Sequence, residues 1–377
     1  MIEYFAITCN KLEEKLVEPI KRLNPDLIQL PFHLRQPSVD LINKINDFDI
    51  EVVGKWVTPK NFHNFNLAFF IRLVEQYKNV VKMWDFGGEP ETRPSQPGCR
   101  WYGTAQEYID QLKMFVDVVK TSNPFTLVGS GGFLSATFNG FYGNEDRSDF
   151  LRKLFDLGLG EMIDYISVNS YLYGYGGTKN VIAGIGKMKE IMAWYHCTKP
   201  IIIAETGVPV AGDPRFLHII QTEERQANSI VETHVLFHSV GIDWLVWFQL
   251  FDSCWGLMYE DEGKLKYRKG FDAYKTMVSM LKNYVFVKRF KAYPSRTVEE
   301  RWKTDKVEWH VFQKDEEEIH VIWVCGGESV TAKITVPMKI YNKYGEELVL
   351  DKEFTFTDPI YLKAKKGVVH NLNFMLE

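Results

Sequence analysis

The stretch VVKMWDFGGEPE, residues 80–91, decides how the rest of the chain is interpreted. It opens with an apolar run rich in β-forming residues, breaks at two glycines and then presents Glu89. A short apolar run that ends in a glycine turn is typical of a buried strand that carries a side chain to the edge of its sheet. The stretch IIIAETGVP, residues 201–209, has the same plan and ends on Glu205. The sequence therefore predicts two buried strands, each with a glutamate at its end.

Strand-like and helix-period segments alternate through the first three quarters of the chain. The predicted strands are 4–8, 27–32, 50–53, 80–86, 126–128, 165–168, 201–204 and 244–248. The predicted helices are 11–22, 39–45, 67–77, 105–120, 147–157, 180–194, 223–240 and 273–282. Eight such pairs match the size of a (β/α)8 TIM barrel. A doubly wound sheet, the alternative, would carry a glycine-rich phosphate turn after the first strand, and residues 8–11 have none.

The last quarter of the chain changes to alternating runs separated by turn signals. The runs are 307–312, 319–324, 332–336, 348–350 and 354–356. They predict a small antiparallel β-domain, most simply a sandwich. We therefore expect two domains, a barrel over 1–284 and a β-sandwich over 285–377.

The overall composition favours a soluble globular protein and excludes some partners. Of 377 residues, 45% are hydrophobic and the net charge is −4, so neither nucleic acid nor an anionic membrane is expected to bind. The five cysteines are odd in number and lack CxxC spacing, and the N-terminus does not resemble a secretion signal. A reducing, cytoplasmic location is the simplest expectation. No metal constellation or cofactor motif stands out.

In a barrel, side chains on the loops that follow the strands meet at one face. Glu89 and Glu205 both follow strands, and long loops at 92–104, 130–146 and 252–270 belong to the same face. Cleavage of a glycosidic bond needs one carboxylic acid to protonate the leaving oxygen and one carboxylate at the anomeric carbon. The pair therefore predicts Glu89 as acid/base and Glu205 as nucleophile. The alternative is that each glutamate caps a helix or forms an ion pair at the rim.

Other strand ends carry candidate substrate-binding residues. Tyr171, in VNSYLY, is a candidate to donate its hydroxyl to the nucleophile, or else lines the barrel mouth. Trp247, in LVWFQL, offers a stacking floor for a sugar ring, or else packs in the core. The candidates for contacts with sugar hydroxyl groups are His33, Arg35, Lys55, Trp56 and Asn169. A solvated position at the rim is the alternative for His33, Arg35, Lys55 and Trp56.

Four of these segments, in order, resemble clan A of the glycoside hydrolases, which are retaining (β/α)8 enzymes. The segments are WDFGGEPE, DYISVNSY, IIIAETG and LVWFQLFD, and the tail is similar to the β-sandwich of the β-xylosidase and α-iduronidase family. The resemblance implies retention through a covalent glycosyl-enzyme, with the two carboxyl groups roughly 5 Å apart. Gly88 departs from the clan, which usually has asparagine there to contact the sugar 2-hydroxyl. The departure leaves this contact to Asn169 or Arg35, or implies a different sugar.

The expected function is that of a cofactor-free retaining glycoside hydrolase acting on a small, β-linked oligosaccharide or glycoside. Two alternatives stay open. One is a catalytically inactive barrel that binds carbohydrate, and the other is a transglycosidase that uses the same two glutamates. The sugar, the linkage, exo or endo action and the oligomeric state are not set by the sequence.

Overall fold

The structure is a computed structural model, and it describes residues 4–32, 36–56, 66–91, 101, 103–135, 148–171, 177–210, 220–242, 244–290, 307–325, 329–333, 338–349, 353–367 and 373–375. Its largest sheet is made of β1 (Tyr4–Thr8), β2 (Leu27–Pro31), β3 (Glu51–Trp56), β4 (Met83–Phe86), β5 (Leu127–Gly129), β6 (Phe133–Leu134), β7 (Ile166–Asn169), β8 (Ile201–Thr206) and β9 (Trp244–Trp247). The strands pair in parallel in the order β5-β4-β3-β2-β1-β9-β8-β7-β6.

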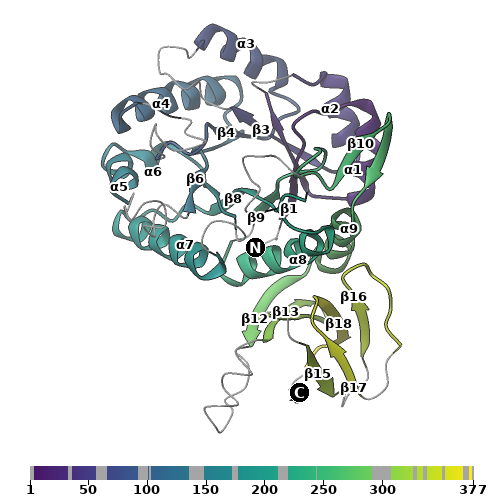
Figure 1. Ribbon diagram of the computed structural model, residues 1–377. Helices are drawn as coiled ribbons and strands as arrows, with labels where there is room; N and C mark the ends of the chain where they lie inside the picture. Colours follow the sequence, from purple (N-terminus) through teal and green to yellow (C-terminus); the bar gives the residue numbers. More distant parts are fainter. Residues whose placement is uncertain are drawn as a thin grey trace. The chain divides into compact units, whose positions relative to one another are not determined.

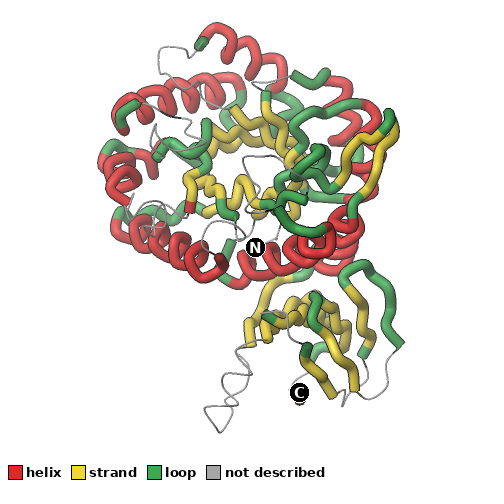
Figure 2. The backbone as a smooth tube through the Cα atoms, viewed as in Figure 1, coloured by secondary structure: helices red, strands yellow, loops and turns green. Residues whose placement is uncertain are grey.

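This sheet closes on itself because β5 also bonds to the start of β7. Gly129 forms a parallel bridge with Tyr165, and the Ser130 amide donates to Tyr165 O at 3.2 Å. The Asp164 amide donates to Val128 O at 2.7 Å. β5 and β6 both lie between β4 and β7 and are two pieces of one barrel strand, so the nine strands among the described residues occupy eight positions. Figure 2 shows these strands arranged in a ring. The predicted TIM barrel is confirmed, and so is each of its strand segments to within a few residues.

Helices follow the strands and lie outside the ring (Figure 1). They are a 3₁₀ turn (Glu14–Leu16), α1 (Val17–Leu23), α2 (Val39–Asn46), α3 (Leu67–Tyr77), α4 (Ala105–Ser122), α5 (Ser148–Asp156), α6 (Leu159–Met162) and α7 (Gly177–Trp194). Side-chain caps start α2, α3 and α4. Asn66 accepts from the Phe69 amide at the start of α3. Ser38 accepts from the Leu41 amide at the start of α2, and Thr104 and Glu107 form a capping box on α4.

Aromatic rings fix the helices on the outer side of the barrel. Trp56 of β3 lies 5.0 Å from Phe70 of α3, and Phe86 of β4 lies 5.0 Å from Phe115 of α4, measured between ring centroids. Phe70 and Phe115 also stack on each other at 4.5 Å. The outward side chains of β3 and β4 therefore bury against these two helices.

One predicted loop contains regular structure. Within 252–270, β10 (Met258–Asp261) and β11 (Lys264–Tyr267) form a two-stranded sheet. Glu262 and Gly263 connect them with φ of 49° and 74°, as two-residue hairpin turns require. In the sequence, the signal for this hairpin is the Glu262-Gly263 pair, because glycine readily adopts the positive φ that the turn needs.

The C-terminal part forms two antiparallel sheets, as predicted. Its strands are β12 (Val285–Phe290), β13 (Val307–Lys314), β14 (Glu317–Val324), β15 (Val330–Lys333), β16 (Lys339–Asn342), β17 (Glu353–Phe356), β18 (Ile360–Lys365) and β19 (Asn373–Met375). One sheet has the order β12-β13-β14-β18-β16 and the other β17-β15-β19. The strand predicted at 348–350 is wrong at its described residues, since Leu348 only donates one backbone bond to Ile340.

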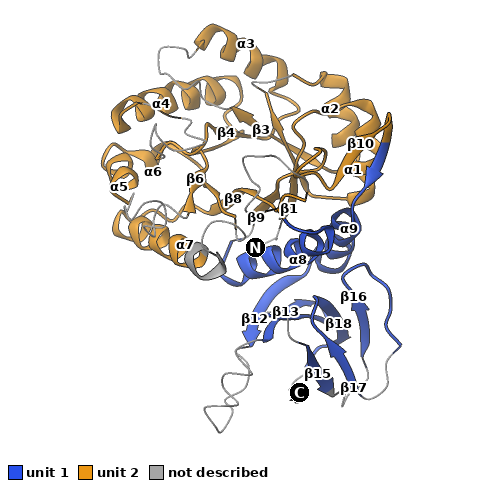
Figure 3. Ribbon diagram, in the orientation of Figure 1, with its two compact units in different colours: residues 1–3, 221–243, 265–377 blue, residues 4–220, 244–264 orange. Residues whose placement is uncertain are grey.

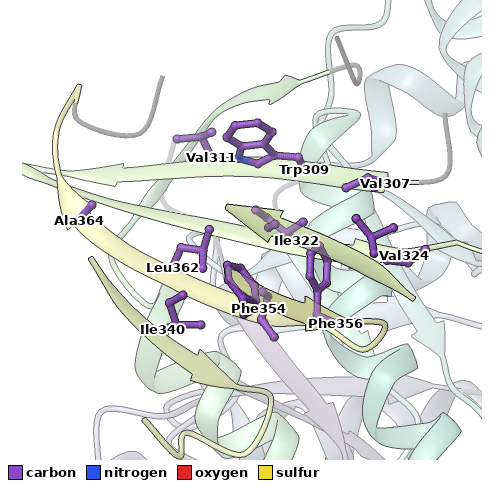
Figure 4. Packing of buried hydrophobic residues seen from close by; sticks show 13 residues of the cluster. Val307, Trp309, Val311, Ile322, Val324, Ile340, Phe354, Phe356, Leu362 and Ala364 are labelled. Carbon is purple, nitrogen blue, oxygen red and sulfur yellow. The ribbon is translucent and has the colours of Figure 1, made fainter. Parts of the chain in front are cut away.

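The core between these sheets comes mainly from alternate residues of β13, β14, β15, β17 and β18 (Figure 4). Its members include Val307, Trp309, Val311, Ile322, Ile340, Phe354, Phe356 and Leu362. Inward-facing side chains at a period of two are what a sandwich requires. Trp309 also donates its indole N–H to His320 Nδ1 at 2.8 Å, so the polar atom of this buried ring is satisfied.

The chain divides into two compact units (Figure 3). One comprises 4–220 and 244–264 and contains the whole barrel sheet. The other comprises 221–243 and 265–377, with α8 (Glu223–Ser239), α9 (Lys269–Leu281) and the C-terminal strands, in addition to residues 1–3. The domain boundary predicted between 284 and 285 stays a prediction.

Candidate active site

The barrel interior changes from apolar to polar toward the carboxyl ends of the strands. One apolar layer has a residue at or beside each of seven strands: Ala6, Leu27, Val53, Met83, Tyr165, Ile202 and Val246. Side chains on a strand alternate between its faces, so residues two positions further along also point inward. On five of the strands these residues are Thr8, Gln29, Lys55, Asp85 and Ser167. The two predicted catalytic glutamates lie beyond this polar layer.

A β-bulge in β8 turns Glu205 into the barrel. As far as Val168, β7 and β8 pair residue by residue, but Asn169 pairs with Glu205, one position later than regular register. Because Ile202 points inward, strict alternation would turn Glu205 outward. The extra residue reverses this direction and places Glu205 beside Asn169.

Glu89 is presented by a turn with unusual backbone angles. Gly87 has φ of 70° and Glu89 has φ of 46°, in the left-handed region that few residues other than glycine adopt. The Glu89 amide donates to Gly132 O at 2.8 Å, and Gly88 forms a bridge with Gly132. A left-handed glutamate held in this way is a form of strain that concentrates at functional sites.

The second glutamate of this segment has a different environment. Glu91 is buried and accepts a hydrogen bond from the Leu134 amide of β6. Its carboxylate thus ties the loop that carries Glu89 to the neighbouring strand. Glu89 is only half-buried, and it is the better placed of the two to meet a substrate.

Asn169 bridges the two predicted catalytic carboxylates. Its Nδ2 donates to Glu89 Oε1 at 3.1 Å and to Glu205 Oε2 at 3.3 Å. The two oxygens can be no further apart than the sum of these distances. Gly132 makes room for the bridge, because a Cβ atom there would lie 2.2 Å from Asn169 Oδ1.

Glu205 receives two further donors. Tyr171 donates its hydroxyl to Glu205 Oε2 at 2.9 Å, which is the contact predicted for it. Lys55 Nζ forms an ion pair and hydrogen bond with Glu205 Oε1. Donors and a positive charge favour the ionised form of a carboxyl group. The arrangement therefore suits Glu205 to be a carboxylate.

Besides Glu205, a fully buried acid lies next to Lys55. Asp85 is the cross-strand partner of Lys55 and is 1% exposed. It accepts hydrogen bonds from Ser167 Oγ and, at 3.3 Å, from Gln29 Nε2. Burial raises the pKa of the Asp85 carboxyl group, while the Ser167 bond and the charge of Lys55 act in the opposite direction.

An aromatic cluster lies beside the nucleophile candidate. The Trp255 ring is in edge contact with Tyr171 at 5.7 Å and with Phe248 at 5.8 Å between centroids. Asp252 fixes this loop by accepting from the Cys254 and Trp255 amides, both at 2.7 Å. Trp255 is 9% exposed and Phe248 is half-buried, so part of this cluster is accessible to a ligand.

The two tryptophans predicted to contact substrate, Trp56 and Trp247, point away from the barrel interior. Trp247 is 0% exposed and directly follows the inward-facing Val246, so it fits the packing alternative, and its stacking role stays a prediction. Trp56 packs on Phe70, as described above, and its expected contact with substrate stays a prediction. Its neighbour Lys55 is the residue of β3 that faces the site, and no sequence signal indicated that it would pair with Glu205. His33 and Arg35 lie outside the described residues.

The described residues contain neither a cluster suited to a metal ion nor a helix suited to cross a membrane. No cluster of three or more His, Cys, Asp or Glu side chains there is arranged to hold a metal ion. None of the helices in that part of the chain combines the length and apolarity needed to cross a bilayer.

Comparison with known proteins adds evidence about the fold. No protein family's sequence profile matches the chain, and no curated protein matches it. Solved structures do match. An α-L-arabinofuranosidase from Thermotoga maritima shares 12% identity over 96% of both chains, with a TM-score of 0.62. A GH30 endoxylanase from Clostridium papyrosolvens C71 shares 11% over 97% of this chain and 96% of its own, at 0.62. A glucosidase from Croceicoccus marinus shares 10% over 96% and 95%, at 0.64. This chain therefore has the fold of these three structures over almost its whole length, as the resemblance to clan A implied.

Proposed function

We propose that this chain is a retaining glycoside hydrolase in which Glu89 is the acid/base and Glu205 the nucleophile. The observation that carries the proposal is the Asn169 bridge, which holds one oxygen of each carboxyl group within 3.3 Å of a single nitrogen atom. The solved structures named above, an arabinofuranosidase, an endoxylanase and a glucosidase, support glycosidic-bond hydrolysis as the reaction class.

The difference between the two carboxyl groups supports the assignment of roles. Glu205 accepts from Asn169, Tyr171 and Lys55, which favours its ionised form. Glu89 accepts from the same Asn169 nitrogen atom. Glu89 would protonate the leaving oxygen while a Glu205 oxygen attacks the anomeric carbon. In the second step Glu89 would take a proton from the water molecule that attacks the anomeric carbon and releases the sugar.

The separation of the carboxyl groups supports retention over inversion. Inverting enzymes keep their carboxyl groups roughly 6.5–9.5 Å apart to admit a water molecule, and retaining enzymes about 5–5.5 Å. The two Asn169 contacts, at 3.1 and 3.3 Å, bring one oxygen of each carboxyl group to the same nitrogen atom, which favours the shorter separation of retaining enzymes. Direct attack by Glu205 is therefore the better fit.

The proposed substrate is a β-linked glycoside or short oligosaccharide. The Trp255 and Phe248 rings, beside the nucleophile, support a site that packs on one sugar ring. Rates on defined oligosaccharides of increasing length test this point. Internal cleavage of long polymers at rates comparable to those of short substrates would contradict it.

Azide rescue tests the catalytic roles directly. With a 4-nitrophenyl β-glycoside, Glu205→Ala should lose activity and recover it with azide, giving the glycosyl azide of inverted configuration. Glu89→Ala should instead give the azide of retained configuration, because azide then attacks the glycosyl-enzyme. Glu91→Ala is the matched control, and azide should not rescue it.

Three other results would contradict the proposed roles or the proposed reaction. Azide products with the two configurations exchanged would reverse the roles of Glu89 and Glu205. Saccharide binding without turnover across a panel of aryl glycosides would support the carbohydrate-binding alternative. Transfer to added sugar in preference to water would identify a transglycosidase.

A further inference from the structure

Lys55 is a buried cation in the barrel mouth with an acid on either side. It follows the inward-facing Val53 by two positions on β3, and its side chain is 7% exposed. Its Nζ pairs with Glu205 Oε1. On the neighbouring strand, its cross-strand partner is Asp85, whose carboxyl group is influenced by the Lys55 charge.

The two oxygens of Glu205 have separate partners. Oε2 accepts from Tyr171 and Asn169, and Asn169 also reaches Glu89, so Oε2 faces the gap between the carboxyl groups. Oε1 is held by Lys55. Lys55 can therefore keep its contact with the side chain while Oε2 forms and breaks a bond.

We propose that Lys55 controls how readily Glu205 leaves the covalent intermediate, an inference that rests on the proposed function. In the first step a Glu205 oxygen bonds to the anomeric carbon, the bond to the leaving oxygen breaks, and Glu89 gives that oxygen its proton. In the second step water attacks the same carbon and gives a proton to Glu89. The electron pair of the ester bond then returns to Glu205, which becomes a carboxylate again.

The position of Lys55 has opposite effects on the two steps. Glu205 loses its negative charge in the first step and regains it in the second. A cation beside Oε1 stabilises the charged form, so it opposes attack and favours release. Removal of the Lys55 charge should therefore slow the second step and leave the first step unchanged or somewhat faster.

Several titrating groups surround this pair in the described residues. Three of them lie around Glu205. They are Lys55 on β3, Glu89 in the turn after β4 and Tyr171 in the segment after β7. Lys55 also faces Asp85 from β4. The effect of Lys55 must therefore be measured at Glu205 itself and not from a pH profile alone.

The first experiment is a ¹³C NMR titration of the glutamate carboxyl groups in the full chain without substrate. Glu205→Gln identifies the Glu205 signal. The pKa of Glu205 should rise by at least one unit, a tenfold change in proton affinity, in Lys55→Met and return toward the wild-type value in Lys55→Arg. The control is Lys120→Met, which removes an ion pair with Asp164 elsewhere in the same unit and should leave the signal unchanged. An unchanged Glu205 pKa in Lys55→Met overturns the proposal.

The second experiment measures the two steps by rapid mixing with 2,4-dinitrophenyl β-glycosides. Lys55→Met should show a larger burst of dinitrophenol and a second step at least tenfold slower, with the first step unchanged or somewhat faster. A pKa shift with both steps slowed equally would reduce Lys55 to a structural role and contradict the inference. If the wild-type chain cleaves no glycoside, the proposed function fails. The titration then still decides whether Lys55 stabilises the ionised form of Glu205.

Discussion

Gly132 is expected to be essential because it leaves room for the bridge between the two carboxyl groups. A Cβ atom at this position would lie 2.2 Å from Asn169 Oδ1 and 2.9 Å from its Cγ, far inside contact distance. Gly132→Ala should therefore displace the Asn169 side chain and break its bonds to Glu89 and Glu205. Hydrogen bonds to charged groups contribute about 1.5–3 kcal/mol each. If one such bond is lost in the transition state, kcat/KM should fall roughly 10- to 100-fold.

The assay is kcat/KM on the 4-nitrophenyl glycoside that the wild type hydrolyses fastest. Gly186→Ala in α7 is the matched control, because a Cβ atom there meets nothing within 4 Å. The decisive measurement is a double-mutant cycle. In an Asn169→Ala background, Gly132→Ala should cost less than about twofold, since the group it displaces is already absent. Wild-type activity in Gly132→Ala, or an equal loss in both backgrounds, would refute the reasoning.

Three further predictions concern stability and binding. Burial raises the pKa of Asp85 in the folded chain above its pKa in the unfolded chain. The folded wild type therefore loses stability as the pH rises from the unfolded-state pKa toward the folded-state pKa. Asp85→Asn should therefore gain stability relative to wild type in urea unfolding as the pH rises above the ordinary aspartate pKa of about 3.8, and a constant difference would contradict this. Thr104→Ala removes the capping box on α4 and should cost about 1 kcal/mol in urea unfolding without a change in kcat. Trp255→Ala should raise KM for aryl glycosides more than it lowers kcat, because the ring lies beside the Glu205 partner Tyr171, and an unchanged KM would exclude sugar contact.

Much of the fold could be predicted from local patterns. Apolar runs located all eight barrel strands, because burial on both faces leaves a continuous apolar signature. Glycine turns after two of these runs placed both glutamates at strand ends. The hairpin after β9 and the strands β12, β16 and β18 were missed, since short strands with charged residues lack this signature. β19 was missed because it has only three residues.

The sequence by itself determined which segments form the barrel and which acids stand at the ends of its strands, since hydrophobic periodicity and turn residues are local properties. Only the tertiary structure decided which side chains face one another. The bulge beside Asn169 turns Glu205 inward, and β3 directs Lys55 into the barrel and Trp56 against α3. One residue of register reverses the face of every side chain on a strand. Register is set by pairing between segments far apart in the chain, so no local pattern contains it.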